Sequence, residues 1–483
     1  MKVEVPMGWE TTTLGDVARW GSGGTPSRRN PEFFNGSIPW IKTGELGDKF
    51  ISGTEEHISE DAIKKSSAKI FSAGSVGIAM YGATIGKLSI FAVDASTNQA
   101  CAVAKPLCDL LSNEFLYYYL LSERRALIDS GKGGAQPNIS QGILRDWPLS
   151  LPPLNEQHRI VAKIETLFSE MDKGIESLKI AREQLKVYRQ AVLKNAFEGK
   201  LTSQWREQNK DKLATARQLL ASANQNIDSQ LKAPSSWIVC RVEDVLILGP
   251  SNGRSVKDRK DGFPVLRLTA LKGGKIELSE SKSGDWNRDE AQAYIVKEGD
   301  FLLSRGNGSK HLVGRGGVVP KHEDEVAYPD TIVRLRVNPE LILIKFFSLL
   351  WESRVLRDQI EAASQTTAGI YKINQGHIKA FAVPVPTLAE QQLIVRELEE
   401  KMSLIDHQLH DVDLAIAASE TLRQSILKKA FSGQLVPQDP SDEPASALLA
   451  RIQSEKSASA MSKASHKNSP AKGGRKARSK EAS

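Results

Sequence analysis

The chain has 483 residues, of which 40% are hydrophobic and 25% are charged, so roughly three domains of about 150 residues each are expected. This composition excludes global disorder. Six of the seven net positive charges lie in residues 455–483, so the charge balance of the remaining chain does not by itself indicate nucleic-acid binding.

The cysteine content and the lack of long apolar runs exclude two classes of protein. Three cysteines without a Cys-x-x-Cys pair argue against a disulfide scaffold or a zinc finger. The first residues lack an apolar targeting segment, and no run approaches the roughly 18 apolar residues of a membrane span. We therefore expect a cytoplasmic protein without a membrane partner.

Seven segments are expected in chain order, and the fold class is α/β (α+β). They are a first body at 1–150, a long helix at 151–201, a helical linker at 202–234, a second body at 235–383, a second long helix at 384–435, an extension at 436–454, and a disordered basic tail at 455–483.

Both bodies are predicted to be rich in strands. Apolar runs at 75–80 and 87–93 in the first body, and at 300–303 and 331–337 in the second, have the length and spacing of strands. Related phrases open both bodies, at Trp9 and at Trp237. We expect one fold that carries two different surfaces.

The two long helices are predicted from an internal repeat. Residues 152–201 align without a gap with residues 386–435 at an offset of 234, and 18 of the 50 positions are identical. Each copy carries an apolar stripe at 4-3 spacing over about five heptads, which is typical of a coiled coil. Prolines precede both copies, and Gly199 and Gly433 stand where the helices should stop.

The two stripes predict that the helices pair with each other. They run from Ile164 to Ala196 and from Leu398 to Ala430. Two such helices in one chain can pack antiparallel as a rod of roughly 65 Å, related by an internal pseudo-twofold repeat. The alternative is a helical hairpin that stabilises a larger fold.

Polar, glycine-rich loops occur at comparable places in both bodies. Arg and Lys suit guanine or phosphate, Asn and Gln suit adenine, and Gly allows close approach of the backbone to a phosphate. The candidate DNA-binding residues are Tyr81, Gly82, Thr84, Lys87, Gln136, Asn138, Arg305, Asn307, Ser309, Lys310, Lys372 and Asn374.

No catalytic or metal site is predicted. The loop at 82–88 has three spacer residues where a phosphate-binding loop has four, and Leu88 stands where that loop needs Ser or Thr. His407 and His410 lie three residues apart on a long helix without a third ligand nearby in the sequence. The pattern favours a protein that recognises its target rather than a catalyst.

A family resemblance follows from the repeated phrase. Pro-Leu-x-Glu-Gln-x-x-Ile-Val occupies 153–161 and, with Thr387 in place of Pro, recurs at 387–395. Both helices end in Leu-Lys-x-Ala-Phe-x-Gly-x-Leu, at 193–201 and 427–435. This doubled arrangement resembles the specificity (S) subunit of type I restriction-modification systems, the HsdS family.

The resemblance implies two similar target-recognition domains joined by two antiparallel coiled-coil helices. Each domain would read one half of a bipartite sequence in double-stranded DNA, and the helices would set the spacing and dock two methyltransferase (M) subunits. The chain itself would hold no cofactor and catalyse nothing. S-adenosylmethionine, ATP and magnesium would belong to the M subunits and to motor-nuclease (R) subunits.

An alternative of a different class is a non-catalytic scaffold whose two α/β heads bind protein partners. A scaffold needs no DNA, whereas a specificity subunit gives its methyltransferase a sequence preference. The bases recognised do not follow from the sequence.

Overall fold

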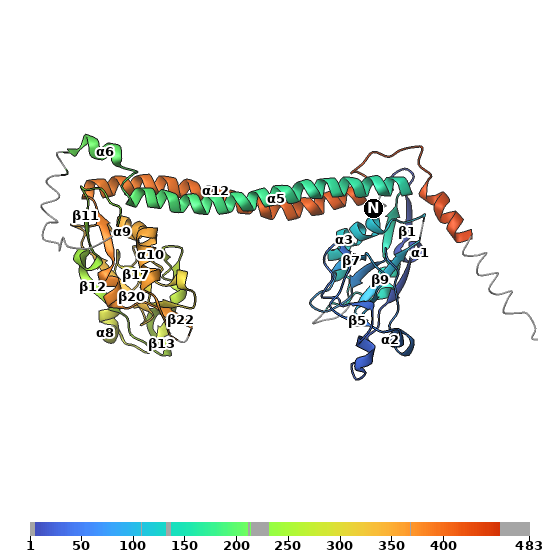
Figure 1. Ribbon diagram of the computed structural model, residues 1–483, viewed down its shortest axis with the longest axis horizontal. Coiled ribbons are helices and arrows are strands. Elements are labelled where there is room, and N and C mark those ends of the chain that lie inside the picture. Colours follow the sequence, from blue (N-terminus) through green and yellow to red (C-terminus); the bar gives the residue numbers. More distant parts are fainter. Residues whose placement is uncertain are drawn as a thin grey trace, which may run out of the picture. The chain divides into compact units, whose positions relative to one another are not determined.

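A computed structural model describes residues 5–107, 109–131, 137–210, 213, 231–367 and 369–454. Its contacts divide the chain into two compact units (Figure 1). Unit 1 comprises Met1–Ser177 with Ala415–Ser483, and unit 2 comprises Leu178–Leu414. Both boundaries fall inside the long helices, because each head packs on the helix segments next to it. The expected tail at 455–483 and most of the expected linker lie outside the described residues.

The long helices follow the predicted repeat. Helix α5 (Leu154–Phe197) and helix α12 (Leu388–Phe431) each have 44 residues, and both ends are related by the offset of 234. Every residue of the two predicted stripes is buried or half-buried. Gly199 and Gly433 both have φ of 74°, a left-handed conformation that glycine adopts without strain at a helix end.

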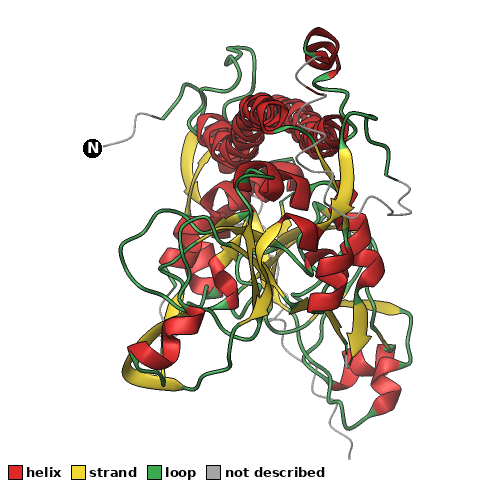
Figure 2. Cartoon of the chain, turned by 90° about the vertical axis from the view of Figure 1, so that its left-hand side faces the viewer, coloured by secondary structure: helices red, strands yellow, loops and turns green. Residues whose placement is uncertain are grey.

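Ion pairs show that α5 and α12 pack antiparallel. Figure 2 shows the two long helices end-on. In unit 2, Arg189 of α5 pairs with Asp406 of α12. In unit 1, Arg423 of α12 pairs with Asp172 of α5. The offset of 234 converts one pair into the other, as an antiparallel pair of repeated helices requires. The predicted coiled coil with an internal pseudo-twofold repeat is therefore confirmed.

The main sheets of the two heads share the order and the directions of five strands, and β14 (Leu271–Lys272) adds a sixth in unit 2. Three antiparallel pairings are followed by one parallel pairing in both. In unit 1 the order is β2 (Ala18–Ser22), β9 (Cys101–Pro106), β6 (Val76–Ala79), β7 (Leu88–Phe91) and β4 (Phe50–Ile51). In unit 2 it is β12 (Leu246–Asn252), β20 (Ile332–Val337), β17 (Phe301–Ser304), β19 (Gly316–Val318), β15 (Lys275–Ile276) and β14 (Leu271–Lys272). The expectation of one fold in two copies is confirmed.

Smaller sheets complete each head. In unit 1 they are β1 (Glu10–Thr13) with β10 (Pro148–Leu151), and β5 (His57–Ile58), β3 (Ile38–Ile41) and β8 (Ser96–Thr97). In unit 2 they are β11 (Ile238–Arg241) with β23 (Ala382–Val385), β13 (Asp258–Leu266) with β16 (Ser281–Gly284), and β18 (Gly306–Asn307), β22 (Ile370–Lys372) and β21 (Gln365–Thr367).

Short helices complete the two units. In unit 1 they are α1 (Leu14–Val17), η1 (Pro31–Phe34), α2 (Glu60–Lys65), α3 (Asn113–Asp129) and α4 (Gln141–Asp146). In unit 2 they are α6 (Ser203–Gln208), η2 (Val242–Val245), η3 (Leu268–Ala270), α8 (Arg288–Ala291), η4 (Gln292–Tyr294), η5 (Lys310–Leu312), α9 (Ile344–Glu352), α10 (Arg354–Ala363) and α11 (Gln375–Ala380).

The units differ where the head meets the long helices. In unit 1, Phe168 packs edge-to-face against Tyr118, with ring centroids 6.0 Å apart, and the Arg423 guanidinium lies 4.7 Å from the centre of the Phe168 ring. In unit 2, Met402 stands at the position 234 residues after Phe168 and lines, with Leu349, a cleft of about 600 Å³. Smaller side chains therefore leave open in unit 2 a space that aromatic rings fill in unit 1.

The C-terminal extension belongs to unit 1. Residues 445–454 are helical, and Ala445 and Leu448 are buried in the unit 1 core. The Ala445 N–H donates to the Gly8 carbonyl at 3.0 Å, and Arg159 pairs with Asp442 at 2.7 Å. The extension therefore closes over the start of the chain.

Candidate nucleic-acid interface

The first candidate loop in each unit is the turn of a hairpin, at one end of the strands of the main sheet. In unit 1 the Gly86 N–H donates to the Ala79 carbonyl at 2.8 Å. In unit 2 the Gly314 N–H donates to the Ser304 carbonyl at 3.0 Å. Both glycines have positive φ, 76° and 67°, so the same turn closes a loop at 80–85 and a longer loop at 305–313.

A second candidate segment joins each loop through one main-chain bond. The Ile139 N–H donates to the Met80 carbonyl at 2.8 Å, and the Ile373 N–H donates to the Arg305 carbonyl at 3.1 Å. Ile139 and Ile373 are 234 residues apart, so the repeat extends to this contact.

The structure therefore brings most of the predicted residues of each unit together. Strands β18 and β22 place Gly306 opposite Lys372 and Asn307 opposite Tyr371, which sets Arg305, Asn307 and Lys372 side by side. In unit 1 the same bond places Asn138 next to Tyr81, which is 37% exposed.

Three predicted cations of unit 2 face solvent without a partner. Among the described residues, no group pairs with or accepts a hydrogen bond from the side chains of Arg305, Lys310 and Lys372. Lys310 and Lys372 are exposed, and Arg305 is half-buried. Unpaired cations beside main-chain amides are the arrangement that attracts phosphate.

Lys87 lies at the base of its hairpin and not in the loop. Its ammonium donates to the Gly44 carbonyl at 3.3 Å. By hydrogen bonding, Lys87 corresponds to Arg315, whose guanidinium pairs with Glu352.

Several predicted polar residues support the loops internally. The Asn374 carboxamide accepts the His377 N–H at 2.8 Å and caps α11, and the Asn307 carboxamide accepts the Ser309 N–H at 3.0 Å. Gly82 is exposed and Thr84 is half-buried in the unit 1 loop, and Gln136 lies outside the described residues.

A third segment at this edge was missed from the sequence. It follows the first strand of each main sheet, at 23–30 in unit 1 and at 253–260 in unit 2. The Gly23 N–H donates to the Cys101 carbonyl and the Gly253 N–H to the Ile332 carbonyl, both at 3.3 Å. Ala100, the residue before Cys101, accepts the Met80 N–H, and Thr331, the residue before Ile332, accepts the Arg305 N–H. The third segment therefore adjoins the first loop in both units.

The third segments bring further exposed cations to the edge. Their exposed basic residues are Arg28, Arg29, Arg254, Lys257, Arg259 and Lys260. A signal was present in the sequence, namely basic residues directly after a strand and a glycine. We call the three segments of each unit together its loop edge: 23–30, 80–86 and 137–139 in unit 1, and 253–260, 305–313 and 370–374 in unit 2.

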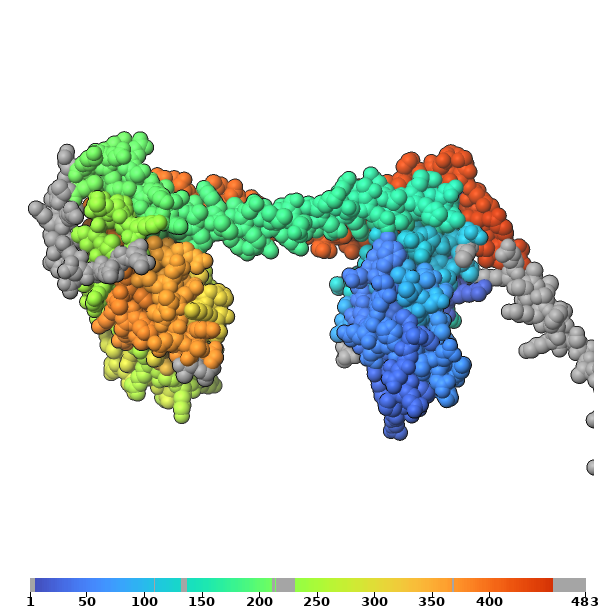
Figure 3. Space-filling view, viewed as in Figure 1, coloured from blue at the N-terminus to red at the C-terminus, as the bar shows by residue number. Residues whose placement is uncertain are grey.

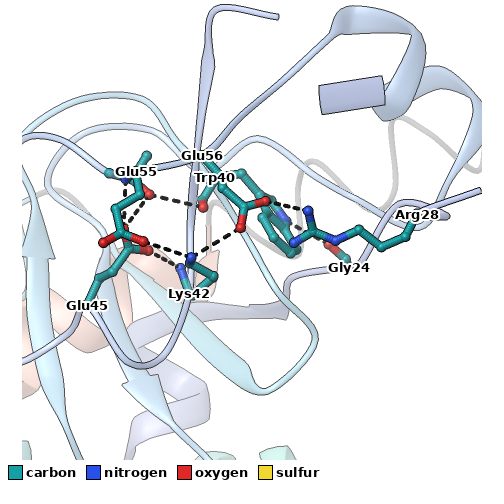
Figure 4. Close-up of polar contacts among 8 residues, drawn as sticks. Gly24, Arg28, Trp40, Lys42, Glu45, Glu55 and Glu56 are labelled. Atoms are coloured by element: carbon teal, nitrogen blue, oxygen red, sulfur yellow. Dashed lines mark hydrogen bonds and ion pairs between the residues drawn. The ribbon is translucent and has the colours of Figure 1, made fainter. Parts of the chain in front are cut away.

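Ion pairs join the third segment of each unit to neighbouring residues, and in unit 2 the segment supplies both an acid, Asp258, and a base, Arg259, which pairs with Asp285 at 2.9 Å. In unit 1, Arg28 of the segment pairs with Glu56 at 2.7 Å (Figure 4). In unit 2, Asp258 of the segment pairs with Lys282 of β16 at 2.6 Å. The Arg28 guanidinium lowers the pKa of the Glu56 carboxyl, and the Lys282 ammonium lowers the pKa of Asp258.

Other kinds of site find little support in the described part of the chain. It contains no group of three or more His, Cys, Asp or Glu side chains that could hold a metal ion. Burial raises the pKa of the Cys101 and Cys240 thiols to about 12, which leaves both unreactive near neutral pH. None of the helices in the described ranges is long and apolar enough to cross a bilayer.

Comparison with known proteins agrees with this geometry. The family model described as "Type I restriction modification DNA specificity domain" matches residues 6–179 and 234–409, one match for each head and the helix segment after it.

Two curated relatives are similar over most of their length. The chain is 29% identical to the Type I restriction enzyme EcoKI specificity subunit of Escherichia coli (strain K12), covering 76% of this chain and 77% of that protein. It is 26% identical to the Type I restriction enzyme EcoDI specificity subunit of Escherichia coli, covering 96% and 99%.

Solved structures share the fold. The HsdS subunit from Thermoanaerobacter tengcongensis superposes with a TM-score of 0.55 at 17% identity, covering 90% of this chain and 99% of that one. A chain from a structure of the assembly and conformational transition of the type I R-M system gives a TM-score of 0.65 at 18% identity, covering 89% and 99%. With a matching domain in each unit, the chain belongs to the type I restriction-modification DNA specificity family.

Proposed function

We propose that this chain is the specificity subunit of a type I restriction-modification complex, and that each loop edge reads one half of a bipartite DNA target. One observation carries the proposal. The two units share strand order and main-chain hydrogen bonds at the loop edge but present different side chains there. Such a pair can bind two similar stretches of backbone while reading different bases.

The surface of the long helices supports docking of two methyltransferase subunits. Six large apolar side chains on α5 and α12 lie outside the paired stripes and are more than half exposed: Ile180, Val187, Tyr188, Leu404, Leu414 and Leu422. Figure 3 shows one side of α5 open along its middle part. Apolar side chains on an outward helix face favour burial against partner helices.

Catalysis belongs to the partners in this proposal. The M subunits would bind S-adenosylmethionine and methylate adenine, and the R subunits would use ATP and magnesium. This chain supplies recognition and spacing in the cytoplasm, where double-stranded DNA is the target. Unpaired cations at the loop edge favour this function over a protein-binding scaffold.

The test is to co-express the chain with its M subunit and to sequence the methylated adenines of the host. Replacing residues 1–148 with the corresponding domain of a relative should change one half of the methylated sequence and leave the other half unchanged. The unreplaced chain is the control. A swap that altered both halves, or a complex that methylated without sequence preference, would contradict the proposal.

A further inference from the structure

Arg28 is held in one position by three side chains of unit 1. Its Nη1 lies 2.7 Å from Oε2 of Glu56, and its Cζ lies 4.2 Å from the centre of the Phe34 ring and 5.3 Å from that of Trp40 (Figure 4). A guanidinium between a carboxylate and aromatic faces has less freedom to move than a free side chain.

The groups that hold Arg28 are themselves fixed. Trp40 is 3% exposed, its indole N–H donates to the Gly24 carbonyl at 3.0 Å, and its ring packs edge-to-face on Phe34. The other oxygen of Glu56 accepts the Lys42 ammonium at 3.1 Å. The carboxylate therefore cannot follow a moving arginine.

This restraint leaves one edge of the guanidinium available. No described group accepts a hydrogen bond from Nε or Nη2 of Arg28, and the side chain is 57% exposed. Two parallel N–H donors on one edge match the N7 and O6 acceptors that guanine presents in the major groove. Because the side chain is already ordered, binding loses less conformational entropy than it would for a free arginine.

We propose that Arg28 is a specificity-determining residue that recognises a guanine in the half-site bound by unit 1. The inference rests on the proposed function and names one reading residue at the loop edge. Glu56 acts as the positioning residue for Arg28.

The exposure of its ion pair argues against a role for Arg28 in stability alone. Both units join the third segment to neighbouring residues by ion pairs; in unit 2 these are Asp258 with Lys282 and Arg259 with Asp285. An ion pair this exposed contributes little to stability, typically below about 1 kcal/mol. What distinguishes Arg28 is that its guanidinium also packs against two aromatic rings, Phe34 and Trp40.

Arg29 provides a matched control. It is the next residue, it is exposed, and its side chain makes no ion pair or ring contact with the described residues. An arginine without a fixed direction suits the phosphate backbone, which carries no sequence information.

The experiment uses the complex with its M subunits. Wild type, Arg28→Ala, Arg28→Lys and Arg29→Ala are compared by sequencing methylated host DNA and by competition with duplexes substituted at each base pair. We expect a G·C pair at one position of the unit 1 half-site. Both Arg28 variants should lose roughly 5- to 150-fold discrimination at that position, since lysine lacks the two-donor edge.

The other outcomes are equally definite. Arg29→Ala should weaken binding to all duplexes alike and reduce the salt dependence by about one contact. Retention of the unit 2 half-site by the Arg28 variants shows that they fold. A half-site without guanine, or unchanged discrimination in both Arg28 variants, overturns the inference while the proposed function stands. A wild-type complex without sequence preference overturns the proposed function instead.

Discussion

Glu390 and Glu156 occupy the same position in the two repeats but have different surroundings. Glu390 is fully buried and accepts three hydrogen bonds: from the Thr202 hydroxyl at 2.6 Å, from Nη1 of Arg206 at 2.6 Å and from the Trp237 indole at 3.0 Å. We predict that Glu390→Ala strongly destabilises unit 2.

The magnitude follows from the groups that lose their carboxylate partner; among the described residues, Arg206 keeps only the neutral acceptors Thr202 and Gly199. The Arg206 side chain is only 14% exposed, and removing one member of a buried ion pair typically costs about 3–5 kcal/mol. The indole N–H and the hydroxyl add penalties of the same origin, about 1–3 kcal/mol each in isolation, but the three groups share one carboxylate and their costs do not add. We expect a loss of about 3–5 kcal/mol.

Glu156→Ala is the matched control in unit 1. Oε1 of Glu156 is buried and has no hydrogen-bond partner, and burial raises the pKa of this carboxyl, while the Trp9 indole and Arg159 oppose the rise. Arg159 keeps its own partner, Asp442. Truncation therefore removes a carboxylate that gains little from its site, and we expect a loss below about 1.5 kcal/mol.

Hydrogen exchange of the full chain measures both effects in one molecule. Amides of β11 report on unit 2 and amides of β1 on unit 1. Glu390→Ala should accelerate exchange in β11 by about 10²- to 5 × 10³-fold and leave β1 nearly unchanged. Equal acceleration in the two strands, or a change of less than tenfold in β11, would refute this account of the buried carboxylate.

Three further predictions concern single features. The pKa of Glu156 is raised in the folded chain, so the folded chain binds this proton more tightly than the unfolded chain does. The stability that the protonated Glu156 contributes is therefore lost as the pH rises through the raised pKa. The advantage of Glu156→Gln over wild type in denaturant unfolding should therefore grow from about pH 4 to about pH 8, and a constant difference would contradict this. Met402→Phe should place a ring in the unit 2 cleft and stabilise unit 2 by about 0.5–1 kcal/mol, whereas Phe168→Met should destabilise unit 1. Effects of the opposite sign would show that the cleft cannot hold a ring. One heptad inserted after Leu178 and another after Val412 should widen the gap in the methylated sequence by roughly three base pairs. Two residues inserted at each point should instead turn the stripe by about 200° and impair assembly. An unchanged gap in an active heptad variant would exclude the helices as the spacer.

The long helices were predictable because their signal is local and occurs twice. An apolar residue at every third or fourth position, prolines before the first turn and a glycine after the last suffice to place both ends. The repeat at offset 234 then doubles the evidence.

The heads were predictable in outline only. Apolar runs located β6, β7, β17 and β20, but the order of strands in a sheet depends on contacts between distant segments and leaves no periodic signal. Arg28 shows the same limit within the candidate site. Its carboxylate partner, Glu56, is 28 positions away, and only the pairing of β3 with β5 brings the two together.

The identical residues of the two repeats show why surface and framework can change separately. Gln157 donates to the carbonyls of Leu110 and Pro152 and accepts the Ser112 N–H, at 2.8, 3.0 and 2.9 Å. Gln391 makes the same three main-chain contacts in unit 2, at 2.9, 2.9 and 2.8 Å.

Any shorter or apolar side chain at these two glutamines would leave main-chain groups buried without partners, so their role permits one residue type. Most side chains at the loop edge are under no such restraint, because the main-chain bonds of Ile139 and Ile373 hold the loops; Asn307 and Asn374, whose carboxamides accept main-chain N–H groups, are exceptions. The fold can therefore change the DNA sequence that it recognises without changing the contacts that keep it folded.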